Sequence, residues 1–147
     1  MTVPFDEMRK LVGYRFPGGT YTIERWENFL VHDVTGAPPP DHGFADPIYG
    51  FSAPLAAMGV TYQELFDLCH ADSNEAIRAG GYDFEYHKPL REGATYRVTG
   101  SILEIDRKRG KRAGLFDLVR FRLRMIDEEG DVALTATNEW IFLRSDP

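Results

Sequence analysis

The chain has 147 residues, a formal net charge of −6 and a single cysteine. This length suits one domain with a hydrophobic core, and we take residues 1–147 as that single domain. The acidic balance argues against a protein that binds nucleic acid or an anionic membrane surface, and no apolar run is long enough to cross a bilayer. One cysteine excludes disulfides within the chain, which favours a reducing, cytoplasmic location.

The N-terminal part of the chain predicts two helices and a strand. Phe5 to Val12 has apolar residues at helical spacing and predicts a short amphipathic helix. Thr20 to Ile23 has strand composition, and Glu24 to Val34 returns to the helical period. We expect Trp26 in this second helix to lie in the core, as we expect of Trp140 near the C-terminus.

The segment from Gly36 to Gly50 predicts a stiff, ordered loop. Three consecutive prolines supply no N–H donors and favour extended geometry. Loops held by rigid elements often carry functional side chains. The loop carries the densest set of proton-handling groups in the chain: Asp41, His42, Asp46 and Tyr49.

The stretch from Ser52 to Cys69 predicts the helical centre of the fold. Its apolar residues recur at three- and four-residue steps, and they are Leu55, Met58, Tyr62, Leu65, Phe66 and Cys69. Pro54 suits a first helical turn, and Thr61 with Glu64 matches a capping box. Gly59 precedes that cap, so we expect either one helix kinked at Gly59 or two short helices.

The remainder of the chain predicts mainly strands. Asp72 to Glu75 caps an expected short helix ending at Gly80-Gly81, and four strands follow, at 82–87, 95–106, 115–125 and 132–143. The apolar phase slips near Gly100–Ile102, which predicts a β-bulge, and Asn138 falls in an otherwise apolar phase. Alternating apolar and polar residues are typical of antiparallel strands covered on one face. We therefore expect an α+β fold, with one antiparallel sheet wrapped round the central helix.

The run from Arg107 to Arg112 holds five cations in six residues and is expected in a turn between two strands. It has two interpretations, a solvated hairpin tip or a clamp for the phosphates of coenzyme A or for an acidic carrier protein. As candidate substrate-binding residues it supplies Arg107, Arg109, Lys111 and Arg112.

The order of these features resembles the MaoC-like (R)-specific enoyl-CoA hydratases and dehydratases of the hot-dog fold. Their motif is roughly G-D-x-N-P-[LIV]-H, and this chain has G-A-P-P-P-D-H from Gly36 to His42. The later P-L-R-E-G at 89–93 is similar to the family's entry into the second half of the sheet. The resemblance covers the whole chain and is nearest to N-terminal-type dehydratase domains that pair with a second hot-dog unit.

In this family an Asp and a His share the water that adds to, or leaves from, a 2-enoyl thioester. His42 matches the family histidine, whereas Ala37 stands at the position of the catalytic Asp and Pro39 at that of the Asn. Two interpretations remain open. Either another carboxylate has taken the role (Asp41, Asp46 or Asp33), or this chain is a non-catalytic half that shapes the acyl pocket of a partner.

The resemblance implies a protein that acts on, or binds, an acyl-CoA or acyl-carrier thioester, with coenzyme A as part of the substrate and no separate cofactor or metal. It also implies a homodimer or a heterodimer with a second hot-dog subunit. The catalytic candidates are His42, Asp46 and Asp41, and the substrate-binding candidates outside the basic run are Tyr49, Pro54 and Gly59. A less favoured alternative is an acyl-CoA thioesterase. The other histidines (His32, His70 and His87) are expected to be surface or capping residues.

Overall fold

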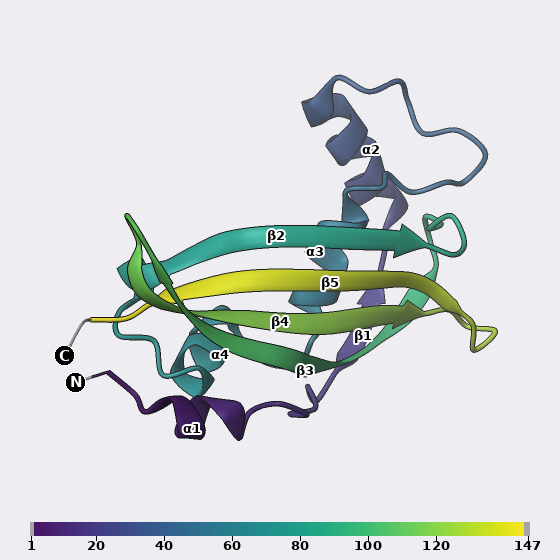
Figure 1. The fold of residues 1–147 in the computed structure, drawn as a ribbon. Coiled ribbons are helices and arrows are strands. Elements are labelled where there is room, and N and C mark those ends of the chain that lie inside the picture. The colour runs from purple at the N-terminus through teal and green to yellow at the C-terminus, as the bar shows by residue number, and fades with distance from the viewer. Residues whose placement is uncertain (1, 146–147) are drawn as a thin grey trace.

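The computed structural model describes residues 2–145 and contains a five-stranded antiparallel sheet with short helices (Figure 1). The elements in chain order are α1 (Phe5–Arg9), β1 (Gly19–Thr22), α2 (Arg25–Thr35), α3 (Tyr49–Ala56), α4 (Tyr62–Leu68), a turn of 3-10 helix (Asn74–Ala76), β2 (Ile77–Tyr86), β3 (Thr95–Gly110), β4 (Gly114–Ile126) and β5 (Val132–Leu143). The strand order is β1-β3-β4-β5-β2, so β1 and β2 form the edges. The α+β architecture expected from the sequence is confirmed.

The long strands alternate as their sequences predict, and one face of the sheet holds the core. On β4 the buried residues alternate with arginines, and the buried set is Val119, Phe121, Leu123 and Met125. The helices α3 and α4 lie behind the sheet in Figure 1 and cover this apolar face. Asn138 shares the buried phase of β5 and is 1% exposed, and its amide atoms have no hydrogen-bond partner within residues 2–145.

The predicted central helix is two short helices, α3 and α4, as one of the two sequence-based alternatives states. Gly59 separates them with φ +89°, and a Cβ there would lie 2.5 Å from the carbonyl oxygen of Gly18, so only glycine fits. Thr61 and Glu64 form the predicted capping box on α4. The position expected of Pro54 is wrong. Because α3 already begins at Tyr49, Pro54 lies inside the helix and not in its first turn.

Two other expectations for the second half are corrected. The helix expected to end at Gly80-Gly81 is reduced to Asn74–Ala76, because β2 begins at Ile77 and pairs with β5. Strand pairing provides hydrogen-bond partners for more of the backbone N–H and C=O groups in this stretch than a short helix would. The basic run does not lie wholly in a turn either, since β3 continues to Gly110. The β3 bulge lies between Ile102 and Glu104, close to its predicted place.

The orientation of α2 is the reverse of the expected one. Four of its five apolar residues point away from the protein, and Val31 is the exception. Trp26 is 64% and Val34 84% exposed, so the core position expected of Trp26 is wrong. Trp140, by contrast, is buried. The face of α2 turned inward is polar and includes Asn28, which is fully buried. Figure 1 shows α2 standing beyond the β2 edge of the sheet.

A buried ion network joins the two ends of the chain. The carboxylate of Asp117, which is fully buried, accepts hydrogen bonds from Arg107 Nε at 2.7 Å and from Arg144 Nε at 2.8 Å. Arg144 also donates to the carbonyl oxygen of Cys69 at 2.8 Å, and Arg107 to that of Val3 at 2.9 Å. These contacts bind the N-terminal segment and the end of α4 to the sheet.

Cys69 is buried as expected, and burial raises the pKa of its thiol to about 12. At neutral pH the thiol therefore stays protonated and is a poor nucleophile. Within the described residues, the helices are all too short or too polar to span a lipid bilayer.

Candidate active site

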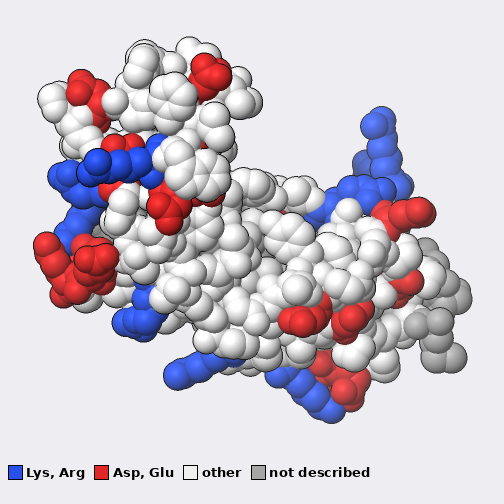
Figure 2. Space-filling model, turned by 180° about the vertical axis from the view of Figure 1, so that it is seen from behind, with Lys and Arg blue, Asp and Glu red and all other residues white. Residues whose placement is uncertain are grey.

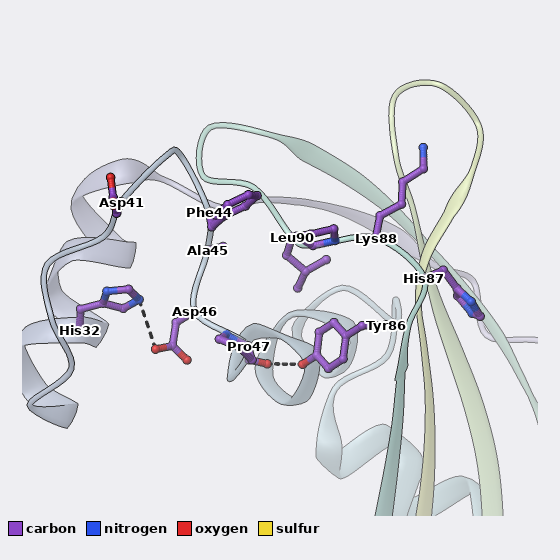
Figure 3. A pocket seen from close by; sticks show the side chains of 11 residues that line it. His32, Asp41, Phe44, Ala45, Asp46, Pro47, Tyr86, His87, Lys88 and Leu90 are labelled. Carbon is purple, nitrogen blue, oxygen red and sulfur yellow. Dashed lines mark hydrogen bonds and ion pairs between the residues drawn. The ribbon is translucent and has the colours of Figure 1, made fainter.

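A cleft of about 530 Å³ lies where the loop before α3 meets the end of β2 (Figure 3). Its walls come from three segments far apart in the sequence: α2, the loop 41–47 and the segment 86–90. The apolar part of the lining is Phe44, Ala45, Pro47, Pro89 and Leu90, and the polar part is His32, Asp41, Asp46, Tyr86, His87 and Lys88. An apolar cleft with a few convergent polar groups is the usual form of a small-molecule site.

His32 and Asp46 face one another in this cleft, and Figure 3 shows the contact between them. His32 Nε2 lies 3.2 Å from Asp46 Oδ2, and the two side chains are 15% and 18% exposed, so both are shielded yet accessible. The ring is not aligned for a linear hydrogen bond, and the contact is that of an ion pair. On the other side of the ring, Nδ1 lies 2.9 Å from the carbonyl oxygen of Pro38.

The Pro38 contact fixes the hydrogen on Nδ1 of His32. A carbonyl oxygen can only accept, so Nδ1 must carry a hydrogen. If His32 were neutral, Nε2 would then present its lone pair to the oxygen of Asp46. A proton on Nε2 or on the carboxyl group would make the contact attractive. Nε2 itself is buried, and in this conformation it faces Asp46.

Asn28 holds the loop in place beneath His32, one helical turn earlier on α2. Its amide donates to the carbonyl oxygen of Phe44 at 3.0 Å and to Glu92 Oε2 at 2.9 Å, and its Oδ1 accepts from the backbone N–H of Asp46 at 2.9 Å. The other oxygen of Asp46, Oδ1, accepts from the N–H of Ile48 at 2.9 Å. The carboxylate is thus fixed both through its backbone and through its side chain.

The first N–H groups of α3 are already engaged in hydrogen bonds within the chain. Besides the bond from Ile48, the N–H of Tyr49 donates to the carbonyl oxygen of Asp46, and that of Gly50 to Pro47. The start of this helix therefore has no spare donors with which to polarise a thioester carbonyl.

Two tyrosines lie beside the cleft. The hydroxyl of Tyr86 donates to the carbonyl oxygen of Pro47, and burial, followed by the charge of Asp46, raises its pKa. Tyr49 is buried under the start of α3 and is not part of the cleft lining. Burial, and then the nearby carboxylate of Glu27, raises the pKa of Tyr49. Both hydroxyls therefore stay protonated at neutral pH.

The structure places His42 away from the cleft lining. Its side chain is 77% exposed, and Nε2 lies 3.1 Å from Asp41 Oδ2, whose side chain is 78% exposed. Asp41 itself lies at the rim of the cleft, so of the three residues predicted to be catalytic, the cleft includes Asp41 and Asp46. The role predicted for His42 stays a prediction.

Pro54 and Gly59 also lie outside the cleft. Pro54 is buried within α3, and Gly59 lines a separate groove of about 520 Å³ between α3 and α4. Glu64, at the far side of this groove, is engaged in the capping box. Glu64 thus has a structural role at the start of α4.

The predicted basic clamp is divided by the structure. Arg107 turns inward to Asp117. Lys111 and Arg112 are exposed at the tip of the β3–β4 hairpin, and Arg109, also exposed, lies on the last part of β3. The tip is at the opposite end of the sheet from the cleft, because Tyr86 aligns across β5 with Met125, and the strand from Gly114 to Met125 spans roughly 35 Å.

His32 was expected to be a surface or capping residue, whereas its side chain is only 15% exposed and faces Asp46. The signal available was the recurrence of polar residues at one helical turn, Asn28 followed by His32, on a helix whose other face is apolar. That pattern does not say which face turns inward. The contact between His32 and Asp46 also depends on the path of the loop after α2, which brings Asp46 back to this helix. The sequence does not specify that path.

A second cluster of titratable groups lies on the β4–β5 hairpin. The carboxylates of Asp127, Glu129 and Asp131 lie within 4.8 Å of one another, as metal ligands could. Lys88 Nζ already lies among them, at 2.9 Å from Asp127 and 2.7 Å from Asp131. The cluster raises the pKa of Lys88, and the ammonium group provides the positive charge that these carboxylates need.

No protein-family model matches the sequence, and no curated protein does. Among solved structures, the MaoC-like dehydratase from Rhodospirillum rubrum is similar with a TM-score of 0.64 and 16% identity, over 92% of this chain and 94% of that chain.

Two further structures extend the comparison. The HadBC (3R-hydroxyacyl-ACP dehydratase) complex from Mycobacterium tuberculosis matches with a TM-score of 0.68 and 15% identity, over 89% of this chain and 96% of that chain. R-hydratase PhaJ1 from Pseudomonas aeruginosa matches with a TM-score of 0.61 and 16% identity, over 92% of this chain and 83% of that chain. The chain therefore has the hot-dog fold of these dehydratases and hydratases.

Proposed function

We propose that this chain is a MaoC-like hydratase or dehydratase unit that acts on a 2-enoyl or 3-hydroxyacyl thioester and works as part of a dimer in the cytoplasm. The observation that carries the proposal is the apposition of His32 and Asp46 in a cleft with apolar walls. The shared fold supports it, because solved structures of that fold include dehydratases and an R-hydratase. Hydration is redox-neutral, so coenzyme A would be present only as the carrier of the acyl group.

The carboxylate and the imidazole of the pair suit this reaction. In the hydration direction, Asp46 Oδ2 would accept a proton from water as the water oxygen bonds to the β-carbon. His32 would donate the proton on Nε2 to the α-carbon, where the electron pair of the double bond arrives. One water is added, and the carboxyl proton then returns to the imidazole across the 3.2 Å contact. Dehydration is the same sequence in reverse.

The alternative is that the chain is the non-catalytic half of a pair. The observation that favours it is the loop sequence, with Ala37 and Pro39 in place of the family's Asp and Asn. The likeness to HadBC supports it too, because that structure is a complex. In this alternative the cleft would provide only an acyl-binding wall, and catalysis would take place on the partner.

Turnover by the purified chain separates the two functions. We expect the chain alone to hydrate crotonyl-CoA or a bulkier 2-enoyl-CoA, followed as the loss of the conjugated thioester absorbance. Release of free thiol, measured in the same samples, would identify a thioesterase instead. A chain that binds enoyl-CoA but hydrates it only after a second hot-dog subunit is added is the non-catalytic half.

The dimer is supported by apolar surface that one chain leaves open. β2 is an edge strand with Tyr82 and Tyr86 about two-fifths exposed, and the stripe on α2 formed by Trp26, Phe29, Leu30 and Val34 is about half exposed or more. Figure 2, which views the protein from the helical side, shows few charged residues across the middle of this face. Extended apolar surface of this kind marks an interface, and an open sheet edge invites pairing with another chain.

We therefore expect the protein to sediment as a dimer of the 16.7 kDa chain at micromolar concentration. Replacing Trp26 and Val34 by Ser should shift the equilibrium towards monomer, because the stripe would lose its apolar contacts with the partner. Because both side chains are exposed in the single chain, its melting temperature as a monomer should stay unchanged within a few degrees. A wild-type protein that sediments only as a monomer contradicts this expectation.

A further inference from the structure

Glu92 is a half-buried carboxylate that has no positively charged partner among residues 2–145. The neighbouring cation, Arg91, turns elsewhere, and its guanidinium lies 5.0 Å from the centre of the Phe44 ring. A charge that is partly removed from water lowers stability unless hydrogen bonds compensate for the lost hydration. The side-chain group that provides such a bond to Glu92 is the amide of Asn28.

This amide connects Glu92 to Asp46. Asn28 Nδ2 donates to Glu92 Oε2 at 2.9 Å, and Asn28 Oδ1 accepts from the backbone N–H of Asp46 at 2.9 Å. An ionised carboxylate can only accept, so it orients the amide with its NH2 group towards Glu92 and its oxygen towards Asp46. A hydrogen bond to a charged oxygen is stronger than one between neutral groups, and it polarises the amide, which makes Oδ1 a better acceptor.

The position of Asp46 depends on this acceptor. The loop just before Asp46 is joined to the segment 90–92 by backbone hydrogen bonds, including one from the N–H of Ala45 to the carbonyl oxygen of Leu90 at 2.8 Å. The N–H of Asp46 itself bonds to the side chain of Asn28. Asn28 is fully buried, so water is not available as a substitute acceptor.

We propose that Glu92 is a positioning residue, which through Asn28 holds Asp46 at its place beside His32. The inference rests on the proposed function for the reaction that the pair performs, whereas the chain of hydrogen bonds does not depend on it. Glu92 is not part of the cleft lining, so it acts without touching the substrate. A displacement of about 1 Å at a reacting group can lower a rate about 10²-fold, so a small shift of Asp46 would be sufficient.

Two variants of Glu92 test this role by kinetics. Glu92→Met keeps the length of the side chain and removes both oxygens, whereas Glu92→Gln retains an oxygen that can accept from Asn28. For 2-enoyl-CoA we expect Glu92→Met to lower kcat about 10- to 100-fold and to leave KM within about twofold, because substrate binding is not involved. Glu92→Gln should restore kcat to within about threefold of the wild-type value.

Glu128→Met is the matched control. Glu128 is an exposed carboxylate that accepts from the backbone N–H of Thr95 at 3.2 Å, and it has no hydrogen bond to Asn28. Its removal should leave kcat at the wild-type value. Glu92→Ala is measured beside Glu92→Met with the same expectation, and it takes its place if circular dichroism shows that the Met variant does not fold.

Hydrogen exchange followed by NMR tests the position of Asp46 without reference to activity. In Glu92→Met the N–H of Asp46 should exchange roughly tenfold faster than in the wild type, because its acceptor is no longer held in place. The N–H of Ala45 should exchange as before, since its acceptor is the backbone carbonyl of Leu90. Glu92→Gln should return the exchange of Asp46 to near the wild-type rate.

Each remaining outcome also decides the question. Unchanged exchange at Asp46 in Glu92→Met overturns the proposal, and so does an unchanged kcat. A rise in KM at constant kcat would mean that Glu92 acts in binding, and a Gln variant as impaired as the Met variant would exclude positioning by this hydrogen bond. If the wild-type protein has no turnover, the proposed function fails, whereas the exchange rate still reports whether Glu92 positions Asp46.

Discussion

Replacing His32 by Ala is expected to lower hydratase turnover about 10²- to 10⁴-fold, the usual contribution of a positioned general acid or base. The variant removes the imidazole that faces Asp46 and leaves the core untouched, because the ring lies against the loop and not against the sheet. The measurement is kcat and kcat/KM with 2-enoyl-CoA, alongside circular dichroism to establish that the fold is retained.

Asp46→Asn is the matched variant. Its amide oxygen can still accept the N–H of Ile48, so the start of α3 is kept, while the carboxylate that takes the proton is lost. A loss of similar size is expected. His42→Ala is the comparison that separates two hypotheses, because the sequence points to His42 and the cleft to His32. If His42→Ala abolishes turnover and His32→Ala does not, the pair described here is not the catalytic one.

The second large effect concerns stability. Asp117→Asn should destabilise the protein by about 3–5 kcal/mol, because it leaves Arg107 and Arg144 facing each other without the buried carboxylate between them. The side chain of Arg144 is fully buried, so solvent cannot replace the lost partner. Urea unfolding followed by circular dichroism gives the change in the free energy of unfolding.

Glu104→Gln provides the control for that measurement. Glu104 also pairs with an arginine, Arg120, but both side chains are at least a third exposed. Pairs of this kind contribute about 0–1 kcal/mol, so the variant should unfold close to the wild-type midpoint. If Asp117→Asn were equally mild, the buried network would not be a stabilising feature of this fold.

The strands and the broken central helix could be predicted because their signals are local. Alternation along β4 and β5 and the Thr61–Glu64 cap depend on residues within a few positions of one another. The segment 74–81 was predicted incorrectly because its cap signal and its glycines are local too, whereas its strand pairing with β5 is a long-range interaction.

The candidate site could be predicted only in part. The loop 36–50 was expected to carry functional side chains, and it contributes Asp46 to the cleft. The histidine was misjudged, because periodicity places the apolar residues of α2 on one face without saying whether that face meets the core or a partner. The observed arrangement has Trp26 outside and Asn28 inside. A helix turned the other way, with Trp26 inside and Asn28 outside, would have the same sequence period.

The two-faced character of α2 has a consequence for how the protein can vary. On its inner side, Asn28 and His32 are committed to the loop and the cleft, and on its outer side Trp26 and Val34 form the exposed apolar stripe. In most surface helices one side faces solvent, and the residues on that side can vary freely between related proteins. With the dimer proposed above, both sides are constrained by different requirements. In that case α2 should accept fewer substitutions than its exposure suggests, and a shift of the helix caused on one side would be transmitted to the other.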